Sequence, residues 1–160
     1  MRTLPSEHLD KRIKSVWRVN SLIGTFILAL IVTVVIFLLV RLAGLHLNWL
    51  PAPIIVFLVW RILSFAVFPR IRYARWRYEL LQEEIDIMKG LLFVTRTIIP
   101  MIRVQYTDTS QGPVLRAFGL SSVTIYTAGG SEDIPGLTPE DADALRDRII
   151  ALAKAAKEDI

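Results

Sequence analysis

The chain opens with a long uncharged apolar stretch. No residue between Arg18 and Arg41 is charged, and most are Leu, Ile, Val or Phe. The 19 residues from Leu22 to Val40 would form a helix about 28 Å long, which matches a hydrocarbon core of about 30 Å. A secretory signal peptide is the alternative, but the run exceeds its roughly 7 to 15 apolar residues and no A-x-A site follows. The pattern predicts a transmembrane helix.

A second apolar segment runs from Trp49 to Phe68 and is long enough to cross a membrane again. Pro51 and Pro53 lie at its start, where a helix tolerates proline because first-turn N–H groups have no intrahelical partner. The sequence therefore predicts a two-helix transmembrane hairpin over residues 21–69.

Cations flank the two predicted spans on one side. The loop of residues 41–50 holds only Arg41 and His46, so the positive-inside rule predicts that both termini are cytoplasmic. We expect the flanking cations to contact the anionic headgroups of membrane lipids without specificity. They are Lys11, Arg12, Lys14, Arg18, Arg70, Arg72, Arg75 and Arg77.

Arg61 is the one ionisable residue inside either span, and no Asp or Glu lies between Asp10 and Glu79. Its guanidinium therefore needs an intramembrane polar contact that is not a carboxylate of its own hairpin. Lipid phosphates or backbone carbonyls are one interpretation. An acid or polar group of another chain is the other, since an unpaired charge in lipid is costly.

After Arg77 the pattern changes to alternation, which is typical of strands. Trp76, Tyr78 and Leu80 share one parity, and Ile85 and Ile87 repeat it before a tight turn at Lys89-Gly90. The strand from Leu91 to Ile99 ends at Pro100, which favours an edge or a bulge.

Further alternation follows along the chain. Over residues 101–107 it predicts that Ile102, Val104 and Tyr106 point inward. Over residues 122–128 it predicts the same for Val123 and Ile125. Gly129-Gly130 then turns the chain into a run that ends at Ile134, whereas residues 111–119 favour a short helix or turn. Six short strands favour a small antiparallel barrel or sandwich.

A helix closes the chain. Thr138 is the expected N-cap, Pro139 the first helical residue, and acids crowd the positive end of the helix dipole. Leu145, Ile149, Leu152 and Ala156 form one apolar stripe that must bury against the sheet. Residues 70–160 are thus expected to form an α+β cytoplasmic domain, preceded by the hairpin and by a basic N-terminal segment over residues 1–20.

Composition supports this division. The 160 residues are 53% hydrophobic with a mean hydropathy of +0.47, too apolar for an ordinary soluble domain. Of the net charge of +4, residues 1–20 carry five cations and two acids, whereas residues 69–160 carry twelve cations and thirteen acids. The basic residues therefore fit a membrane surface, and no nucleic-acid partner is expected. The absence of Cys is consistent with a cytoplasmic domain.

Residues that could carry catalysis are scarce. The only histidines are His8 and His46, and there is no Cys, nucleophile elbow, Walker loop or metal-ligand spacing. Asp108, Ser110 and Ser131 are interpreted as turn and cap residues. The acids Glu140, Asp141, Asp143 and Asp147 are interpreted as a solvated helix face. We expect no enzyme activity, no cofactor and no metal site.

Several segments resemble the bacterial pleckstrin-homology-like family of small membrane proteins, the YdbS type. The segments are residues 75–78 (Arg-Trp-Arg-Tyr), 88–91, 99–105, 112–120 (Gly-Pro-Val-Leu-Arg-Ala-Phe-Gly-Leu) and 123–130. The resemblance implies a seven-stranded, partly open barrel capped by the C-terminal helix, in a multi-pass protein of the bacterial cytoplasmic membrane. It also implies assembly with like domains, as a homo-oligomer or with a longer relative that has tandem copies.

Specific phosphoinositide binding is not expected, because the loop between the first two predicted strands is acidic, Gln82-Glu83-Glu84. Three hypotheses remain. The first is a non-catalytic, membrane-anchored interaction module that acts in envelope organisation or stress tolerance. The second is an accessory subunit of a larger membrane complex. The third is a binder of lipids or amphipathic peptides at the inner leaflet.

Overall fold

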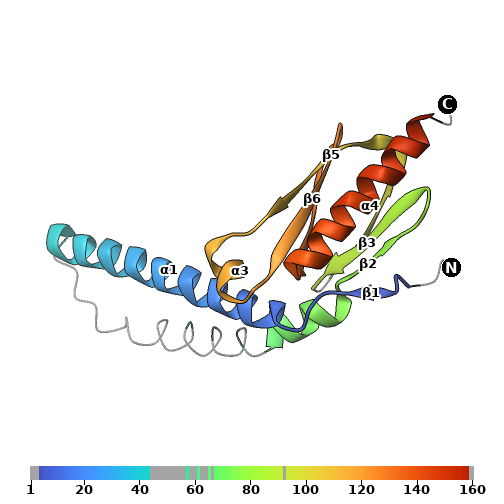
Figure 1. The fold of residues 1–160 in the computed structure, drawn as a ribbon. Helices are drawn as coiled ribbons and strands as arrows, with labels where there is room; N and C mark the ends of the chain where they lie inside the picture. Colours follow the sequence, from blue (N-terminus) through green and yellow to red (C-terminus); the bar gives the residue numbers. More distant parts are fainter. Residues whose placement is uncertain are drawn as a thin grey trace.

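A long helix projects from a small domain of two sheets and a C-terminal helix (Figure 1). The computed structural model describes residues 4–43, 57, 61, 65, 67–91 and 93–158. Its elements are β1 (Glu7–His8), α1 (Ile13–Ala43), β2 (Arg77–Leu80), β3 (Glu84–Gly90), β4 (Val94–Pro100), η1 (Met101–Arg103), β5 (Val104–Ser110), α3 (Pro113–Ala117), β6 (Ser121–Thr127), β7 (Gly130–Leu137) and α4 (Pro139–Glu158).

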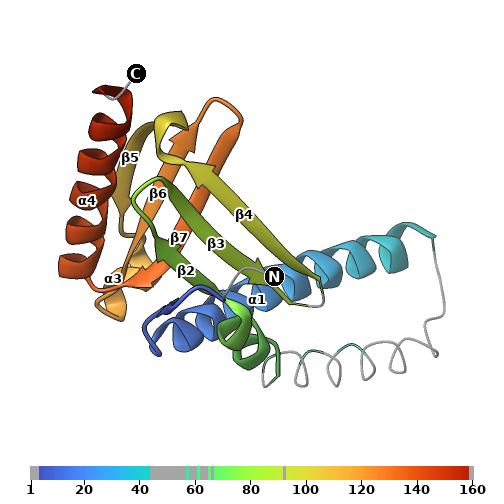
Figure 2. The ribbon, with the colours of Figure 1, turned by 90° about the vertical axis from the view of Figure 1, so that its right-hand side faces the viewer.

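The strands form two antiparallel sheets, one in the order β1-β2-β3-β4 and one in the order β5-β6-β7. The short helix η1 carries the chain from the first sheet to the second. Helix α4 packs against η1, β5, β6 and β7 (Figure 2). Among the described strands, the sheet edges are β1, β4, β5 and β7, and β4 and β7 do not pair with each other, so the barrel stays open between them.

The core lies between the sheets. Ile85 and Ile87 of β3 and Val123 and Ile125 of β6 are at most 1% exposed, and Trp76 and Tyr78 are also buried. These side chains confirm the predicted inward parity. One face of each sheet is therefore apolar, and burial of that face is the main favourable term in folding.

The predicted parity of residues 101–107 is wrong at two positions. Val104 is buried, but Ile102 is 42% and Tyr106 is 52% exposed, whereas Met101 is fully buried. Residues 101–103 form the 3-10 helix η1 instead of a strand, and a register shift separates Val104 from Tyr106. One extra residue in a strand moves all later side chains to the other face, and so Thr107 is buried in place of Tyr106.

The two helical segments predicted after residue 110 are confirmed. Residues 113–117 form α3. In α4 the Thr138 hydroxyl accepts a hydrogen bond from the Asp141 backbone N–H over 3.1 Å. Ile149 is fully buried, and Ala142 and Ala153 widen the apolar stripe beyond the predicted positions.

Helix α1 begins nine residues before the predicted span. It belongs both to the apolar segment and to the domain formed by the two sheets. Its first turns contribute Ile13 and Val16, at 0% and 2% exposure, to the domain core, together with Leu9. Strand β1 pairs with β2 just before it. The N-terminal segment is therefore part of the domain rather than a separate basic arm, and β1 brings the described strands to seven instead of six.

Among the described residues, one helix has the length and composition to cross a membrane. It covers Ile13–Leu42 with a mean hydropathy of 3.1, and none of its most apolar window is buried. Most of the predicted second span, Trp49 to Phe68, and the loop before it lie outside the described residues. Residues 67–75 are helical and lead directly into β2.

Candidate functional site

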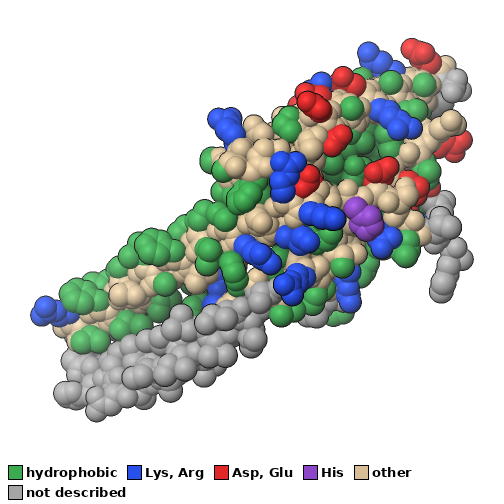
Figure 3. All heavy atoms as spheres, turned by 60° about the horizontal axis from the view of Figure 1, so that its bottom comes forward, with side chains coloured by type: hydrophobic (Ala, Val, Ile, Leu, Met, Phe, Trp, Pro, Cys, Tyr) green, Lys and Arg blue, Asp and Glu red, His purple; other side chains and the backbone are tan. Residues whose placement is uncertain are grey.

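The base of α1 packs against the helical residues 67–75 through cations on aromatic rings. Lys14 Nζ lies 4.5 Å from the centroid of the Tyr73 ring, and the Arg72 guanidinium lies 4.4 Å from the centroid of Trp17. Tyr73 also donates a hydrogen bond to the Leu9 carbonyl over 3.0 Å. We call these contacts the junction, since they join the apolar helix to the domain. Figure 3 shows Lys and Arg side chains gathered in this region.

Other cations predicted at the membrane surface are held by polar groups of the protein. Arg12 pairs with Asp10 at 2.9 Å and also donates to the Phe118 carbonyl over 3.3 Å. The Arg12 hydrogen bonds hold the pKa of Asp10 below its usual value, and partial burial opposes this effect. Lys11 and Arg70 are exposed. Within the predicted cation set, Arg12, Lys14 and Arg72 therefore contact other groups of the protein, whereas Lys11 and Arg70 are exposed.

Arg61 finds its polar contact on α1. Its Nη2 atom donates to the Ser21 carbonyl oxygen over 2.7 Å and lies 3.3 Å from Ser21 Oγ. The same carbonyl accepts a hydrogen bond from the Thr25 hydroxyl over 2.6 Å. A backbone carbonyl of its own chain, one of the predicted alternatives, thus takes the place of a carboxylate.

Arg18 lies one turn before Ser21 on α1. Its guanidinium is 5.9 Å from the centroid of the Phe65 ring. The Arg18 Nε atom is buried without a hydrogen-bond partner among the described residues. Arg18 and Arg61 therefore both connect α1 to the segment that follows it, one through an aromatic face and the other through a carbonyl.

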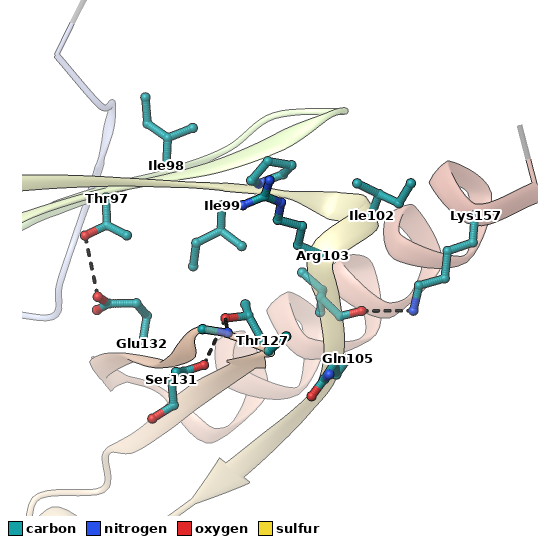
Figure 4. Close-up of a pocket in the computed structure, with 15 residues that line it drawn as sticks. Thr97, Ile98, Ile99, Ile102, Arg103, Gln105, Thr127, Ser131, Glu132 and Lys157 are labelled. Atoms are coloured by element: carbon teal, nitrogen blue, oxygen red, sulfur yellow. Dashed lines mark hydrogen bonds between the residues drawn. The ribbon is translucent and has the colours of Figure 1, made fainter. Parts of the chain in front are cut away.

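A groove of about 690 Å³ opens between the free edges of β4 and β7 (Figure 4). Ile99 points into it from β4, and Ile102 and Arg103 lie on its rim. Lys157 of α4 closes one end by donating to the Val104 carbonyl over 2.9 Å. Because β4 and β7 do not pair, each offers backbone N–H and C=O groups to the groove.

Side chains, rather than a strand ladder, bridge the two sheets beside this groove. Glu132 of β7 pairs with Lys89 of β3 and accepts a hydrogen bond from the Thr97 hydroxyl of β4 over 3.5 Å (Figure 4). Glu132 occupies the inward parity of β7, opposite Ile125. These polar contacts connect the two sheets while their edges remain free.

Two further polar groups are buried in the first sheet. Asp86 is 2% exposed, and its carboxylate accepts hydrogen bonds of 2.5 to 3.0 Å from the Arg96 guanidinium. Burial, with a smaller contribution from the charges of Glu7 and Asp141, raises the pKa of Tyr78 to about 12. Neither group faces the groove, and both are interpreted as structural.

The polar residues considered for chemistry are not assembled into a site. Asp108 pairs with Thr124, Ser110 with Ser122 and Ser131 with Tyr126 along β6, so Ser110 and Ser131 are separated by about 13 Å of strand. Asp143 and Asp147 both pair with Arg146. Within the part of the chain that the structure describes, no group of three or more acids or histidines could hold a metal ion.

Comparisons with known proteins agree with this architecture. The family described as bacterial PH domain matches residues 18–153. The UPF0699 transmembrane protein YdbS of Bacillus subtilis (strain 168) is 38% identical over 161 residues, covering all of both chains. The UPF0699 transmembrane protein YdbT of the same organism is 28% identical over 83 residues, which are 49% of this chain and 17% of YdbT. No solved structure gives a significant match.

The groove and the junction could not be read from the chain. The groove depends on two strand edges that lie 30 or more residues apart, and neither edge has a distinctive residue pattern. In the sequence Arg61 is conspicuous because it interrupts an apolar run, whereas its partner Ser21 is an ordinary small polar residue.

Proposed function

The chain belongs to the bacterial PH domain family, and from this premise we propose that it is a non-catalytic, membrane-anchored interaction module. In this proposal the groove between β4 and β7 receives an extended segment of a like domain. That domain comes from a second copy or from a longer relative. The relative named YdbT, of which the match covers only 17%, shows that longer proteins contain a related segment.

The proposed topology is a two-helix hairpin in the bacterial cytoplasmic membrane with both termini cytoplasmic. Helix α1 and the name of the relative YdbS support membrane attachment. The Arg61 contact with Ser21 supports a helix returning beside α1, because the residue lies 40 positions further along the chain. The exposed cations Lys11 and Arg70 then lie near the anionic inner leaflet.

The observation that carries the proposal is the groove with its two free strand edges. An extended peptide can add to such an edge through backbone hydrogen bonds, and nearby side chains select it. Ile102 on the rim is 42% exposed, and Arg103 adds a positive charge. This mechanism needs only strand edges and nearby side chains, which the groove provides. The groove therefore supports a proposal of binding rather than catalysis.

Cross-linking of the full-length chain in its own membrane tests the proposal. The chain has no Cys, so a single Gln105→Cys places one thiol at the exposed rim of the groove. Lys154→Cys, on an exposed position of α4, is the control. We expect a cross-linker with one thiol-reactive end and one photoreactive end to join Gln105→Cys, but not Lys154→Cys, to a second copy or to the longer relative.

Native mass measurement of the detergent-extracted complex, with Ile102→Asp as a blocking variant, completes the test. Leu81→Asp is the matched control, because Leu81 is 41% exposed in the turn between β2 and β3, outside the groove. Loss of assembly in Ile102→Asp alone supports the proposal. A monomer with retained lipid, or a fixed complex with an unrelated partner, contradicts it and favours the lipid-binding or accessory-subunit alternative.

A further inference from the structure

The turn between β3 and β4 exposes apolar side chains. Phe93 is 88% exposed and Val94 is 49% exposed, and Leu91 precedes them without an intervening charge. Exposure of a Phe side chain to water is unfavourable because of its large apolar surface. Apolar side chains grouped on a surface that contacts only water are unfavourable. The exposed turn therefore indicates an apolar partner.

The first sheet has one end beside α1, and the β3–β4 turn lies at that end (Figure 2). Its position is fixed to the segment before β2, because Arg75 Nη1 donates to the Leu91 carbonyl over 2.6 Å. The opposite turn of the hairpin, near Leu81, lies a whole strand away, or about 20 Å for the seven residues of β3. The apolar turn is therefore at the membrane end of the domain.

The strand ends on either side of the turn approach each other closely. Gly90 pairs with Val94 to close it, and Gly90 has a φ of +149°. A Cβ at Gly90 would lie 1.9 Å from the Phe93 carbonyl oxygen, so only glycine fits. The backbone of Phe93 thus lies directly beside Gly90, at the end of the β3–β4 hairpin.

We infer that the β3–β4 turn is a second membrane contact, in which Phe93 and Val94 enter the interfacial region of the inner leaflet. A cation adjoins the turn, since Arg75 donates to it, and Arg70 is exposed in the helical segment before β2. An apolar side chain flanked by cations is suited to an anionic bilayer surface, with acyl chains below and phosphates above. Continuity with α1 favours lipid over a protein partner.

This inference rests on the proposed membrane topology and adds a consequence to the proposed function. The hairpin alone would leave the domain free to tilt against the membrane surface. A second contact on the first sheet restricts that tilt. The groove between β4 and β7 would then keep one orientation relative to the membrane, and a like domain in the same membrane would meet it in the same plane.

A fluorescent label on the turn gives a direct test with the full-length chain. Phe93→Cys, labelled with an environment-sensitive dye, is reconstituted into vesicles of phosphatidylcholine with phosphatidylglycerol, and Leu81→Cys is the matched control. We expect quenching of the label at position 93 by lipids brominated on the acyl chain, and at position 81 by aqueous iodide only. Quenching of position 93 by iodide to the same extent as position 81 would overturn the inference.

Protein density separates lipid contact from contact with a second copy. Lipid quenching at position 93 should persist at high dilution of the protein in the vesicles. Shielding from iodide that appears only at high protein density, without lipid quenching, identifies a protein contact and overturns the inference. The Gln105→Cys cross-link in the same vesicles reports separately on the proposed assembly, so either result can fail while the other holds.

Discussion

The Arg61 guanidinium donates to the carbonyl oxygen of Ser21 over 2.7 Å, across 40 residues of sequence. The carbonyl belongs to a continuous helix, so the arginine attaches its own segment to α1 without needing an acid. In the proposed hairpin this would be a hydrogen bond between membrane helices, which is worth about 1 kcal/mol because the separated helices find other partners.

Replacement of Arg61 by Leu should therefore weaken the association of its segment with α1 by about 1 kcal/mol. Resistance of the micelle-bound chain to unfolding by sodium dodecyl sulfate, followed by circular dichroism, measures the change. Arg41→Leu is the control. Within the part of the chain that the structure describes, the Arg41 guanidinium lies over the Phe37 ring of its own helix and does not join α1 to another segment. Equal sensitivity of the two variants would contradict the assigned role of Ser21.

Gly136→Ala should loosen the base of α1 from the domain. Gly136 has a φ of +72°, and a Cβ there would lie 2.8 Å from Ile13 Cβ. Backbone strain and the clash together predict a loss of about 2 kcal/mol of unfolding free energy. Thermal unfolding followed by near-ultraviolet circular dichroism measures it. Gly24→Ala is the control, because nothing lies within 4 Å of that site, and it should be neutral or slightly stabilising.

Arg96→Leu should destabilise the first sheet by about 3 kcal/mol, because it leaves the buried Asp86 carboxylate without its guanidinium. The double variant with Asp86→Leu should cost less than the sum of the single variants. Denaturant unfolding of all four chains measures this coupling. Arg146→Leu, which removes pairs with the exposed Asp143 and Asp147 side chains, should cost much less. Strict additivity at positions 86 and 96 would contradict the assigned pair.

Tyr78 should make the domain sensitive to alkali. Burial raises the pKa of Tyr78 to about 12 from 10.0, so the folded state holds the proton more tightly than the unfolded state. Its contribution is complete below about pH 10 and is lost as the pH rises through 12, by about 3 kcal/mol in total. Unfolding free energies between pH 9 and 12 should fall less in Tyr78→Phe than in the original chain. Tyr106→Phe, at a half-exposed position, should leave the fall unchanged.

The sequence determined the elements wherever one physical period dominated. Alternation identified the inward residues Ile85, Ile87, Val123 and Ile125, and Thr138 with Pro139 identified the start of α4. It failed at Ile102 and Tyr106, because a turn of 3-10 helix and a bulge insert residues without interrupting the apolar alternation. It also missed β1, since a two-residue strand has no period and depends on its partner β2.

The apolar run of α1 and the family resemblance were therefore fixed by the chain itself, because lipid solubility and strand periodicity are properties of consecutive residues. The tertiary structure decided everything that depends on distant segments meeting. It placed Ile13 in the domain core, Ser21 beside Arg61, Leu91 beside Arg75, and the free edges of β4 and β7 on either side of one groove. Each contact joins residues that no local pattern relates, and their positions follow only once the core has closed.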